Sequence, residues 1–557
     1  MNSRFPWIVE KPIYILLVIN ILIGLFVFRN YGLSWDEPLF YDYADALGYA
    51  YSPKEWFSEH FDLNNSYGIS GDDHKTRGPA YLFLGRGPVY FLRTLGLDSA
   101  SAWHLVNFLF FQLGVYFLYR FSTRWVNPSA ALAASALFSW QPLLWGHAFI
   151  NPKDPPFLVF FLGAVCLGFE MVDHLFSDTK SNSQNFIRVI IPAILLGIAT
   201  SIRVLGPFAG LLVFIYLAVR VIQNRNWHLV FPASSATTGR TASSKAEEPN
   251  KKLRVSATPW LYFLAYGLIA IIAMFLTWPY LWENPIARFI EVLKLMSDNP
   301  TTLSVLFGGE VYRAGELPRR YFPFMLATTL TELVWILFGI GLVTGYWKLI
   351  TDHSPQKINK LTTTTLTLFW FMFLLAYVLI RRPSMYDGLR HFLFILPPIF
   401  IFIGFAFEYL FEFVTLVWLR AGLLFLIMLP GLLGIFHLHP YEYTYYNSFV
   451  GGTSGAFRNY ETDYWLTCYK ESVQRLEEKV QQPFNLYVHR EGYIAAYYAN
   501  PNNNIHELRG ALNEVRSGDY VLANTRTNED HRVFKDAPVI LQIGRGDAVF
   551  CVTKEIP

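Results

Sequence analysis

"IYILLVINILIGLFVFRNYGLSWDEPLFYDYADALG", residues 13–48, contains the two features that decide the fold and the site. The run 13–28 is apolar except for Asn20, and about 20 apolar residues span the hydrocarbon core of a membrane. The residues before it are basic, as in a signal peptide, but no small-residue cleavage site follows, so we expect an uncleaved first span. Two adjacent carboxylates, Asp36 and Glu37, come directly afterwards and are expected at a membrane surface.

The composition of the whole chain is typical of a membrane protein. Only 16% of the 557 residues are charged, 53% are hydrophobic and the mean hydropathy is +0.28, whereas soluble domains carry about 25% charged residues. The net charge of +3 and the lack of basic stretches interleaved with aromatics argue against a nucleic-acid partner. We predict an α-helical polytopic membrane protein, surrounded by membrane lipids, with about eleven transmembrane helices. The expected spans are 12–29, 102–119, 129–147, 156–176, 187–203, 207–223, 259–278, 324–347, 363–380, 391–408 and 421–437.

The distribution of charge predicts the orientation in the membrane. Lys and Arg dominate 224–258, whereas 31–78 carries nine acidic and three basic side chains, so the N-terminus and 224–258 are expected in the cytoplasm. The segment 31–101 is then the first outer loop and 279–323 a long outer loop. Within the first loop, the apolar stretch 79–97 is interrupted by arginines and Pro88; we expect an interfacial helix there, because a further span would place 224–258 outside. The expected compartment is the plasma (inner) membrane of a bacterium.

The C-terminal region has a different character. Residues 1–440 form the predicted transmembrane domain, and 441–557 are polar, with a helical stretch "ESVQRLEEKVQ" and the strand-like runs "FNLYVHR", "DYVLAN" and "AVFCVTK". We predict a small α/β domain, which an odd number of spans places outside the cytoplasm. Two of the three cysteines, Cys468 and Cys551, lie in this domain, either as a disulfide in an oxidising compartment or as free thiols.

Most of the unusual polar residues fall on the predicted outer face. Ionisable residues at membrane depth usually mark a pathway or a ligand site, and the planar fork of arginine suits phosphate oxygens. Carboxylates from the first two outer loops, facing arginines from the fifth, therefore predict a site for an anionic lipid headgroup. The candidates are Asp36, Glu37, His74 and Lys75 in the first loop, Lys153 and Asp154 in the second, Arg203 in the third turn, and Arg381, Arg382, Tyr386, Asp387, Arg390 and His391 in the fifth.

The order of these motifs resembles that of the C-superfamily glycosyltransferases, in particular the protein O-mannosyltransferases and the lipid A aminoarabinose transferases. The shared features are the acidic pair in "SWDEPLF", an interfacial helix in the first loop, "NPKDPPF", "YDGLRHFLFILPP" and a C-terminal extracytoplasmic domain. The resemblance implies transfer of a hexosyl or pentosyl group from a polyprenyl-phosphate carrier to a protein, lipid or glycan acceptor. The chain departs from the family where it reads "HKTRGPAY" in place of a frequent His-Pro-Pro.

This chemistry assigns a role to each candidate. A departing phosphate needs cations, and an attacking hydroxyl needs a base, so one carboxylate suffices for an inverting displacement. We predict Asp36 as the base, Glu37 as a group that positions it or the acceptor, and Asp154 as an orienting group. The predicted donor phosphate ligands are Lys153, Arg203, Arg381, Arg382, Arg390 and His391, and the predicted acceptor or sugar contacts are His74, Lys75, Tyr386 and Asp387.

Two other functions and one cofactor remain open from the sequence. A transporter or flippase for a lipid-linked sugar would use the same arginines without a base, although paired halves with broken helices are not evident. A binding module on a membrane anchor would not require so many spans. A divalent cation could bind Asp36, Glu37 and Asp154, but their spacing does not demand one.

Overall fold

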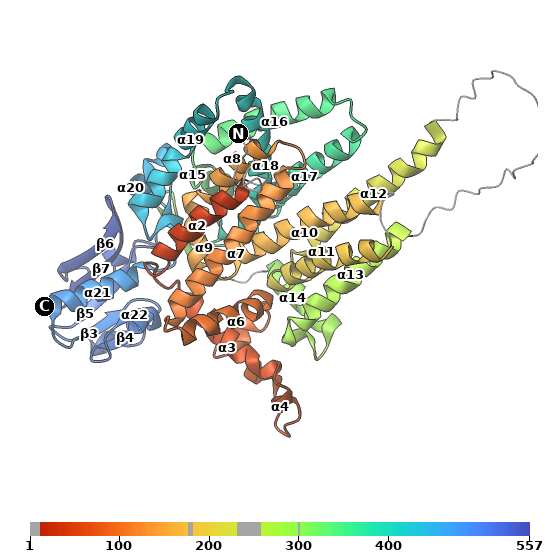
Figure 1. Ribbon diagram of the computed structural model, residues 1–557. Coiled ribbons are helices and arrows are strands. Elements are labelled where there is room, and N and C mark those ends of the chain that lie inside the picture. Colours follow the sequence, from red (N-terminus) through yellow and green to blue (C-terminus); the bar gives the residue numbers. More distant parts are fainter. Residues whose placement is uncertain (1–11, 177–181, 231–257, 299–300) are drawn as a thin grey trace, which may run out of the picture.

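The structure is a computed structural model that describes residues 12–176, 182–230, 258–298 and 301–557. A helical bundle makes up most of it, and a C-terminal domain with a β-sheet lies at one end (Figure 1). Six of the described helices are long and apolar enough to cross a membrane. They are α7 (Ser99–Ser122), α10 (Asp154–Leu175), α13 (Thr258–Leu276), α16 (Leu333–Thr351), α17 (Lys357–Arg381) and α19 (Val417–Leu438).

Further apolar helices complete the bundle. They are α2 (Ile13–Val27), α8 (Pro128–Ser139), α9 (Pro142–Ile150), α11 (Asn182–Ile202), α12 (Pro207–Val230), α15 (Tyr321–Thr328) and α18 (Pro397–Phe413). Helix α10 is central, since it packs against α7, α11 and α12 and against the 3-10 turn η3 (Arg390–Ile395). Its side chains are almost all buried, whereas α13 and α19 leave most of theirs exposed for lipid. The predicted polytopic helical class is therefore confirmed, and the number eleven stays a prediction.

Two of the expected single spans are interrupted, which corrects the sequence prediction. The run 129–147 divides into α8 and α9 immediately before Pro142, because proline lacks an N–H and clashes with the preceding turn. The run 324–347 divides into α15 and α16 between Thr328 and Leu333. In the run 391–408 the helix α18 starts only at Pro397, after the 3-10 turn η3 (Arg390–Ile395), and proline suits this first helical position.

The first loop folds against the bundle. Helix α3 (Glu37–Ala50) packs against α6 (Ala80–Thr94), and α6 packs against α7. The predicted interfacial stretch 79–97 thus contains a helix of 15 residues. The shorter elements between them are α4 (Pro53–Trp56), η1 (Leu63–Ser66) and α5 (Gly71–His74).

The long loop 279–323 contains regular structure that the sequence analysis did not predict. It holds η2 (Pro279–Leu281), α14 (Pro285–Asp298) and a hairpin of β1 (Ser304–Phe307) and β2 (Glu310–Arg313). Both glycines of the hairpin turn, Gly308 and Gly309, have positive φ, which suits the right-handed twist of the two strands. The predicted cytoplasmic linker 224–258 lies outside the described residues from 231 to 257.

The C-terminal domain is a five-stranded mixed sheet with helices, as predicted. The strand order is β4-β3-β5-β7-β6, with β3 parallel to β4 and β5, and β7 antiparallel to β5 and β6. Strands β4 and β6 were not predicted. The elements are η4 (Glu442–Thr444), η5 (Ser448–Val450), α20 (Gly452–Ala456), α21 (Cys468–Val480), β3 (Asn485–Val488), α22 (Gly492–Tyr498), β4 (Asn504–Glu507), η6 (Leu512–Glu514), β5 (Tyr520–Asn524), η7 (Glu529–His531), β6 (Val539–Arg545) and β7 (Ala548–Glu555).

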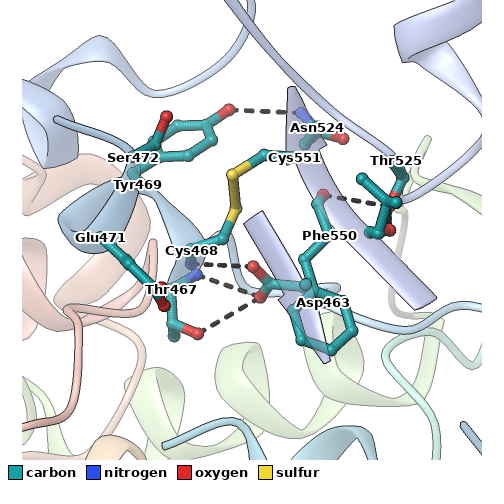
Figure 2. Close-up of a disulfide and its surroundings, with 12 residues drawn as sticks. Asp463, Thr467, Cys468, Tyr469, Glu471, Ser472, Asn524, Thr525, Phe550 and Cys551 are labelled. Atoms are coloured by element: carbon teal, nitrogen blue, oxygen red, sulfur yellow. Dashed lines mark hydrogen bonds between the residues drawn. A yellow bond between two sulfur atoms is a disulfide. The ribbon is translucent and has the colours of Figure 1, made fainter. Parts of the chain in front are cut away.

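A disulfide fastens this domain internally. Figure 2 shows Cys468, at the start of α21, bonded to Cys551 in β7, with both side chains fully buried. Asp463 accepts hydrogen bonds from the backbone N–H groups of Thr467 (3.0 Å) and Cys468 (2.9 Å), which fixes the start of the helix. The structure therefore selects the disulfide from the two alternatives left open by the sequence.

Candidate active site

A cavity of about 280 Å³ lies where the first loop, the start of α10, the end of α11 and the segment after α17 meet. We call it the active-site cavity. One part of its lining is charged or polar and another part is apolar. The first part includes Asp36, Arg77, Lys153, Arg203, Tyr386, Arg390 and His391, and the second includes Val204, Leu205, Val292, Leu293, Met296 and Phe392.

Asp36 is the carboxylate that faces this cavity. It stands at the N-terminus of α3, makes no capping hydrogen bond and is 23% exposed. Its Oδ2 accepts a hydrogen bond from Nη1 of Arg390 at 2.8 Å. Burial raises the pKa of Asp36, but the charges of Arg390 and Arg77 outweigh this effect and hold the pKa below its ordinary value. The carboxyl group is therefore ionised and can accept a proton.

Arg390 is the first member of a buried chain of ion pairs behind Asp36. Its Nη2 lies 2.9 Å from Oδ2 of Asp387, and the other oxygen of Asp387 pairs with Nη2 of Arg526 at 2.7 Å. The Nε of Arg526 in turn lies 3.1 Å from Oε1 of Glu461. Arg526 and Glu461 belong to the C-terminal domain, so this domain supplies the outer end of the chain that holds Asp36.

Aromatic rings enclose the same arginines. The guanidinium of Arg390 lies 4.9 Å from the ring centre of Tyr386 and 5.0 Å from that of Trp465, whose Nε1 donates to Asp387 at 3.1 Å. The guanidinium of Arg526 lies 4.5 Å from the ring centre of Trp35, the neighbour of Asp36. These cation–π contacts restrict the arginines to one orientation.

Three further basic side chains line the cavity: Arg77, Lys153 and Arg203. Arg203 pairs with Asp154 at the start of α10, and Asp154 also accepts a hydrogen bond from the amide of Asn151 at 2.9 Å. Within the described chain, no carboxylate lies within ion-pair distance of the Lys153 amine. Burial, together with the charges of Arg203 and Arg77, lowers the pKa of Lys153 well below its usual range. An anion in the cavity would offset the charges of Arg203 and Arg77 and favour the protonated form of Lys153.

The local sequence brings these cations together. The Oδ1 of Asn151 accepts hydrogen bonds from the backbone N–H groups of Lys153 (3.1 Å) and Asp154 (2.9 Å), which shapes the turn before α10. A Cβ at Gly78 would collide with the carbonyl of Ser201, so only glycine lets the first loop approach the end of α11. This close approach brings Arg77 and Arg203 to the same cavity.

Glu37, predicted beside Asp36 as a catalytic residue, points away from the cavity into the core. It is 0% exposed, and its Oε2 accepts a hydrogen bond from the N–H of Ser34 at 2.6 Å. Its Oε1 accepts a hydrogen bond from Tyr41 and lies 3.2 Å from Nε2 of His104. Glu37 thus fixes the turn that carries Asp36.

Six other candidates also lie outside the lining of the cavity, and one of them is Asp154, which pairs with the lining residue Arg203. Asp387 is the buried centre of the ion-pair chain. His74 is buried against Phe40, and burial, with a smaller effect of the charge of Arg77, lowers its pKa to about 4. The remaining candidates, Lys75, Arg381 and Arg382, do not line the cavity either.

The sequence analysis missed four residues of the site. Arg77 had a visible signal, since it lies in "HKTRGP" beside two residues that were assigned. No signal in the sequence marked Arg526, Glu461 and Trp465, because they lie in a domain that was predicted to be separate. These residues reach the site only because that domain packs on the first loop. Hydrogen bonds from Tyr493 to the carbonyl of Trp35 (2.6 Å) and from the N–H of Leu33 to Tyr498 (2.9 Å) illustrate this packing.

Asp36 and Asp154, two of the carboxylates considered for a divalent cation, are each paired with an arginine. Asp36 is held by Arg390 and Asp154 by Arg203, and each pairing occupies oxygens that a cation would need. Throughout the described residues, no group of three His, Cys, Asp or Glu side chains is placed to hold a metal ion. We therefore derive no step through a metal.

The fold and the site together define a polytopic membrane protein with a cation-rich cavity and a facing carboxylate. No family model and no curated protein matches the chain. Among solved structures it is similar to ArnT from Cupriavidus metallidurans bound to undecaprenyl phosphate, with 12% identity and a TM-score of 0.48 over 99% of this chain and 98% of that one.

Two similar structures come from Archaeoglobus fulgidus. One is an oligosaccharyltransferase tethered with an acceptor peptide, with 10% identity and a TM-score of 0.49 over 93% of this chain and 70% of that one. The other is the oligosaccharyltransferase AglB in complex with an inhibitory peptide and a dolichol-phosphate, with 12% identity and a TM-score of 0.46 over the same shares. Because every TM-score lies below 0.5, we take neither substrate nor residue roles from them.

Proposed function

We propose that the protein is an inverting glycosyltransferase that moves a sugar from a polyprenyl-phosphate donor to an acceptor hydroxyl. The observation that carries this proposal is the shared cavity: the carboxylate of Asp36 faces the same 280 Å³ space as Arg77, Lys153 and Arg203. Cations suited to a phosphate and a carboxylate suited to a proton therefore line the same cavity.

The apolar part of the cavity fits the lipid part of such a donor. Val204 and Leu205 follow α11, and Val292, Leu293 and Met296 lie on α14. Leu293 and Met296 are 39% and 37% exposed, so this wall continues to the surface of the protein. A polyprenyl chain can lie along it while its phosphate contacts the cations.

The reaction follows from this arrangement. The acceptor oxygen attacks C1 of the sugar from the face opposite the phosphate, the C1–O bond to the phosphate breaks, and the electron pair stays on the phosphate. Lys153, Arg203 and Arg77 stabilise that charge, and the proton of the acceptor hydroxyl passes to Asp36. The bound donor also offsets the field of the cations, which raises the pKa of Asp36 and makes it a stronger base when the substrate is in place.

The proposal places the cavity and the C-terminal domain outside the cytoplasm. The buried disulfide between Cys468 and Cys551 supports this orientation, because such bonds persist in oxidising compartments. The distribution of Lys and Arg along the chain supports it independently.

The direct test is the transfer of label from a radiolabelled polyprenyl-phosphate sugar to a crude membrane acceptor fraction by the purified protein. We expect transfer with wild type and with Asp45→Asn, an exposed carboxylate paired with Arg93 at the surface, and loss of transfer with Asp36→Asn. Equal transfer by wild type and Asp36→Asn would remove Asp36 from the mechanism. Movement of labelled lipid across vesicles without transfer, unaffected by Asp36→Asn, would instead identify a flippase.

A further inference from the structure

A second cavity, of about 480 Å³, lies where the transmembrane helices meet the C-terminal domain. We call it the junction cavity. Among the described residues it shares no lining residue with the active-site cavity. The residues of its lining that matter here are Arg29 after α2, His439 after α19, Lys470 and Glu471 in α21, and Arg545 at the end of β6.

The lining of the junction cavity is predominantly positive. Three cations, Arg29, Lys470 and Arg545, stand against the single carboxylate of Glu471. The oxygens of Glu471 are already occupied, since Oε2 accepts hydrogen bonds from Tyr441 (2.8 Å) and Arg545 (3.1 Å) and Oε1 pairs with a neighbouring arginine of α21. Within the part of the chain that the structure describes, no carboxylate pairs with Arg29. The cavity therefore has positive charge available for a ligand.

Two of the three cations are held in place. The Nζ of Lys470 donates to the carbonyl oxygens of Arg29 and Tyr31, which leaves one of its three protons. The Nε of Arg545 donates to the carbonyl oxygen of His439 at 3.0 Å, and its guanidinium lies 4.7 Å from the ring centre of Tyr441. Such a preorganised group loses little side-chain entropy when it binds an anion.

The position of the cavity indicates the source of the anion. Helix α2 ends at Val27 and α19 ends at Leu438, so the cavity begins one or two residues beyond the apolar segments. Near these ends Phe26 is 87% exposed and Phe436 is 79% exposed, as expected for side chains covered by lipid. The junction cavity therefore lies at the depth of the lipid headgroups, where its cations can pair with the phosphate of an anionic lipid.

We propose that the junction cavity binds the phosphate group of an anionic membrane phospholipid, whose acyl chains lie along α2 and α19. Arg29 and the remaining proton of Lys470 contact the phosphate oxygens, and Arg545 completes the positive wall. Because the cations come from both the bundle and the C-terminal domain, the bound lipid joins the two. This site is independent of the proposed transfer reaction.

Native mass spectrometry of the full-length protein tests this proposal. The protein in detergent is mixed with equal amounts of phosphatidylglycerol and phosphatidylcholine. We expect the protein to retain one molecule of phosphatidylglycerol. The form bound to phosphatidylglycerol should exceed the form bound to phosphatidylcholine by about fivefold for each cation that contacts the lipid. Arg29→Gln lowers this retention about fivefold and Arg29→Glu lowers it further. Arg532→Gln, an exposed arginine of the same domain outside both cavities, leaves it unchanged.

Three results would overturn the proposal. The first is equal retention of the two lipids, and the second is unchanged retention in the Arg29 variants. The third is complete displacement of the lipid by inorganic phosphate at the same concentration, which would make the cavity a site for free anions. Arg203→Gln removes a cation of the active-site cavity only; loss of the lipid in that variant, but not in Arg29→Gln, would assign the lipid to the active site instead.

Discussion

Arg526 of the C-terminal domain pairs with Asp387 of the transmembrane domain at 2.7 Å, and both side chains are almost completely buried. Through Asp387 and Arg390 this pair reaches Asp36, which stands 490 positions earlier in the chain than Arg526. The C-terminal domain therefore contributes to the orientation of the proposed base without lining the active-site cavity itself.

Arg526 is expected to act as a positioning residue. Removal of one partner of a buried ion pair costs about 3–5 kcal/mol of stability, and the unpaired Asp387 then draws Arg390 away from Asp36. We expect Arg526→Gln to lower kcat about a hundredfold, with a smaller change in the KM of the donor, and to move the acidic limb of the pH–rate profile to higher pH. Arg526→Lys is expected to restore part of the rate.

A matched variant separates positioning from stability. Arg458 belongs to the same domain and pairs with the buried Asp530 at 2.7 Å, but it does not reach the ion-pair chain. Arg458→Gln is expected to lower the melting temperature and to leave the pH–rate profile of the folded protein unchanged. A similar shift of the acidic limb in both variants would show that Arg526 has only a structural role.

The adjacent carboxylates Asp36 and Glu37 are expected to behave differently. Asp36→Asn should lower transfer about 10²–10⁴-fold because it removes the base. Glu37→Gln keeps the shape of the side chain, but its amide nitrogen faces the donor of Ser34 or Tyr41, which costs about 1–3 kcal/mol of stability. Initial rates per folded molecule and thermal melts of both variants test this; equal loss of rate would place Glu37 in the chemistry as well.

Lys153 is expected to take up a proton when the donor binds. Its pKa is depressed in the free protein by burial and by Arg203 and Arg77, and a bound phosphate raises it again. Lys153 is then protonated as the donor binds. The affinity for the donor therefore falls as the pH rises from the pKa of Lys153 in the free protein to its higher pKa in the complex. At about pH 9 the phosphate group of the donor is already fully ionised, so any proton taken up on binding is taken up by the protein.

Calorimetry can measure this uptake with a short polyprenyl phosphate in two buffers of different ionisation enthalpy. We expect Lys153→Gln to abolish the uptake and to weaken binding by about 1.5–3 kcal/mol, the value of a hydrogen bond to a charged group. The same uptake in wild type and in Lys153→Gln would assign the proton to another group.

The disulfide is expected to stabilise the C-terminal domain. It joins residues separated by 83 positions, and a bond that closes a loop of this size typically contributes about 2–4 kcal/mol. The double variant Cys468→Ala and Cys551→Ala should therefore melt at a lower temperature. Maleimide labelling of the denatured wild type should modify only Cys166 before reduction and all three cysteines afterwards; labelling of three without reduction would contradict the bond.

The sequence alone predicted most features that depend on local patterns. Apolar runs identified the helical bundle, and alternating short runs identified the sheet of the C-terminal domain. The sequence did not predict the lengths of single helices as well, because Pro142 interrupts one apolar run without changing its hydrophobicity. For the site, polar residues on the predicted outer face, together with the family resemblance, selected Asp36, Lys153, Arg203, Tyr386, Arg390 and His391, all of which line the active-site cavity.

Only the tertiary structure decided which of these charges act together. The sequence by itself determined a polytopic helical protein, because long apolar runs must be covered by lipid or protein. The gathering of polar groups on one face of the membrane stays a prediction from the distribution of Lys and Arg. The sequence could not separate Asp36 from Glu37: adjacent side chains on a helix point about 100° apart, and only the docking of the helix decides which of them faces the cavity. Nor could it place Arg526 behind Asp387, because an ion pair between distant segments depends on how two separately folded surfaces pack.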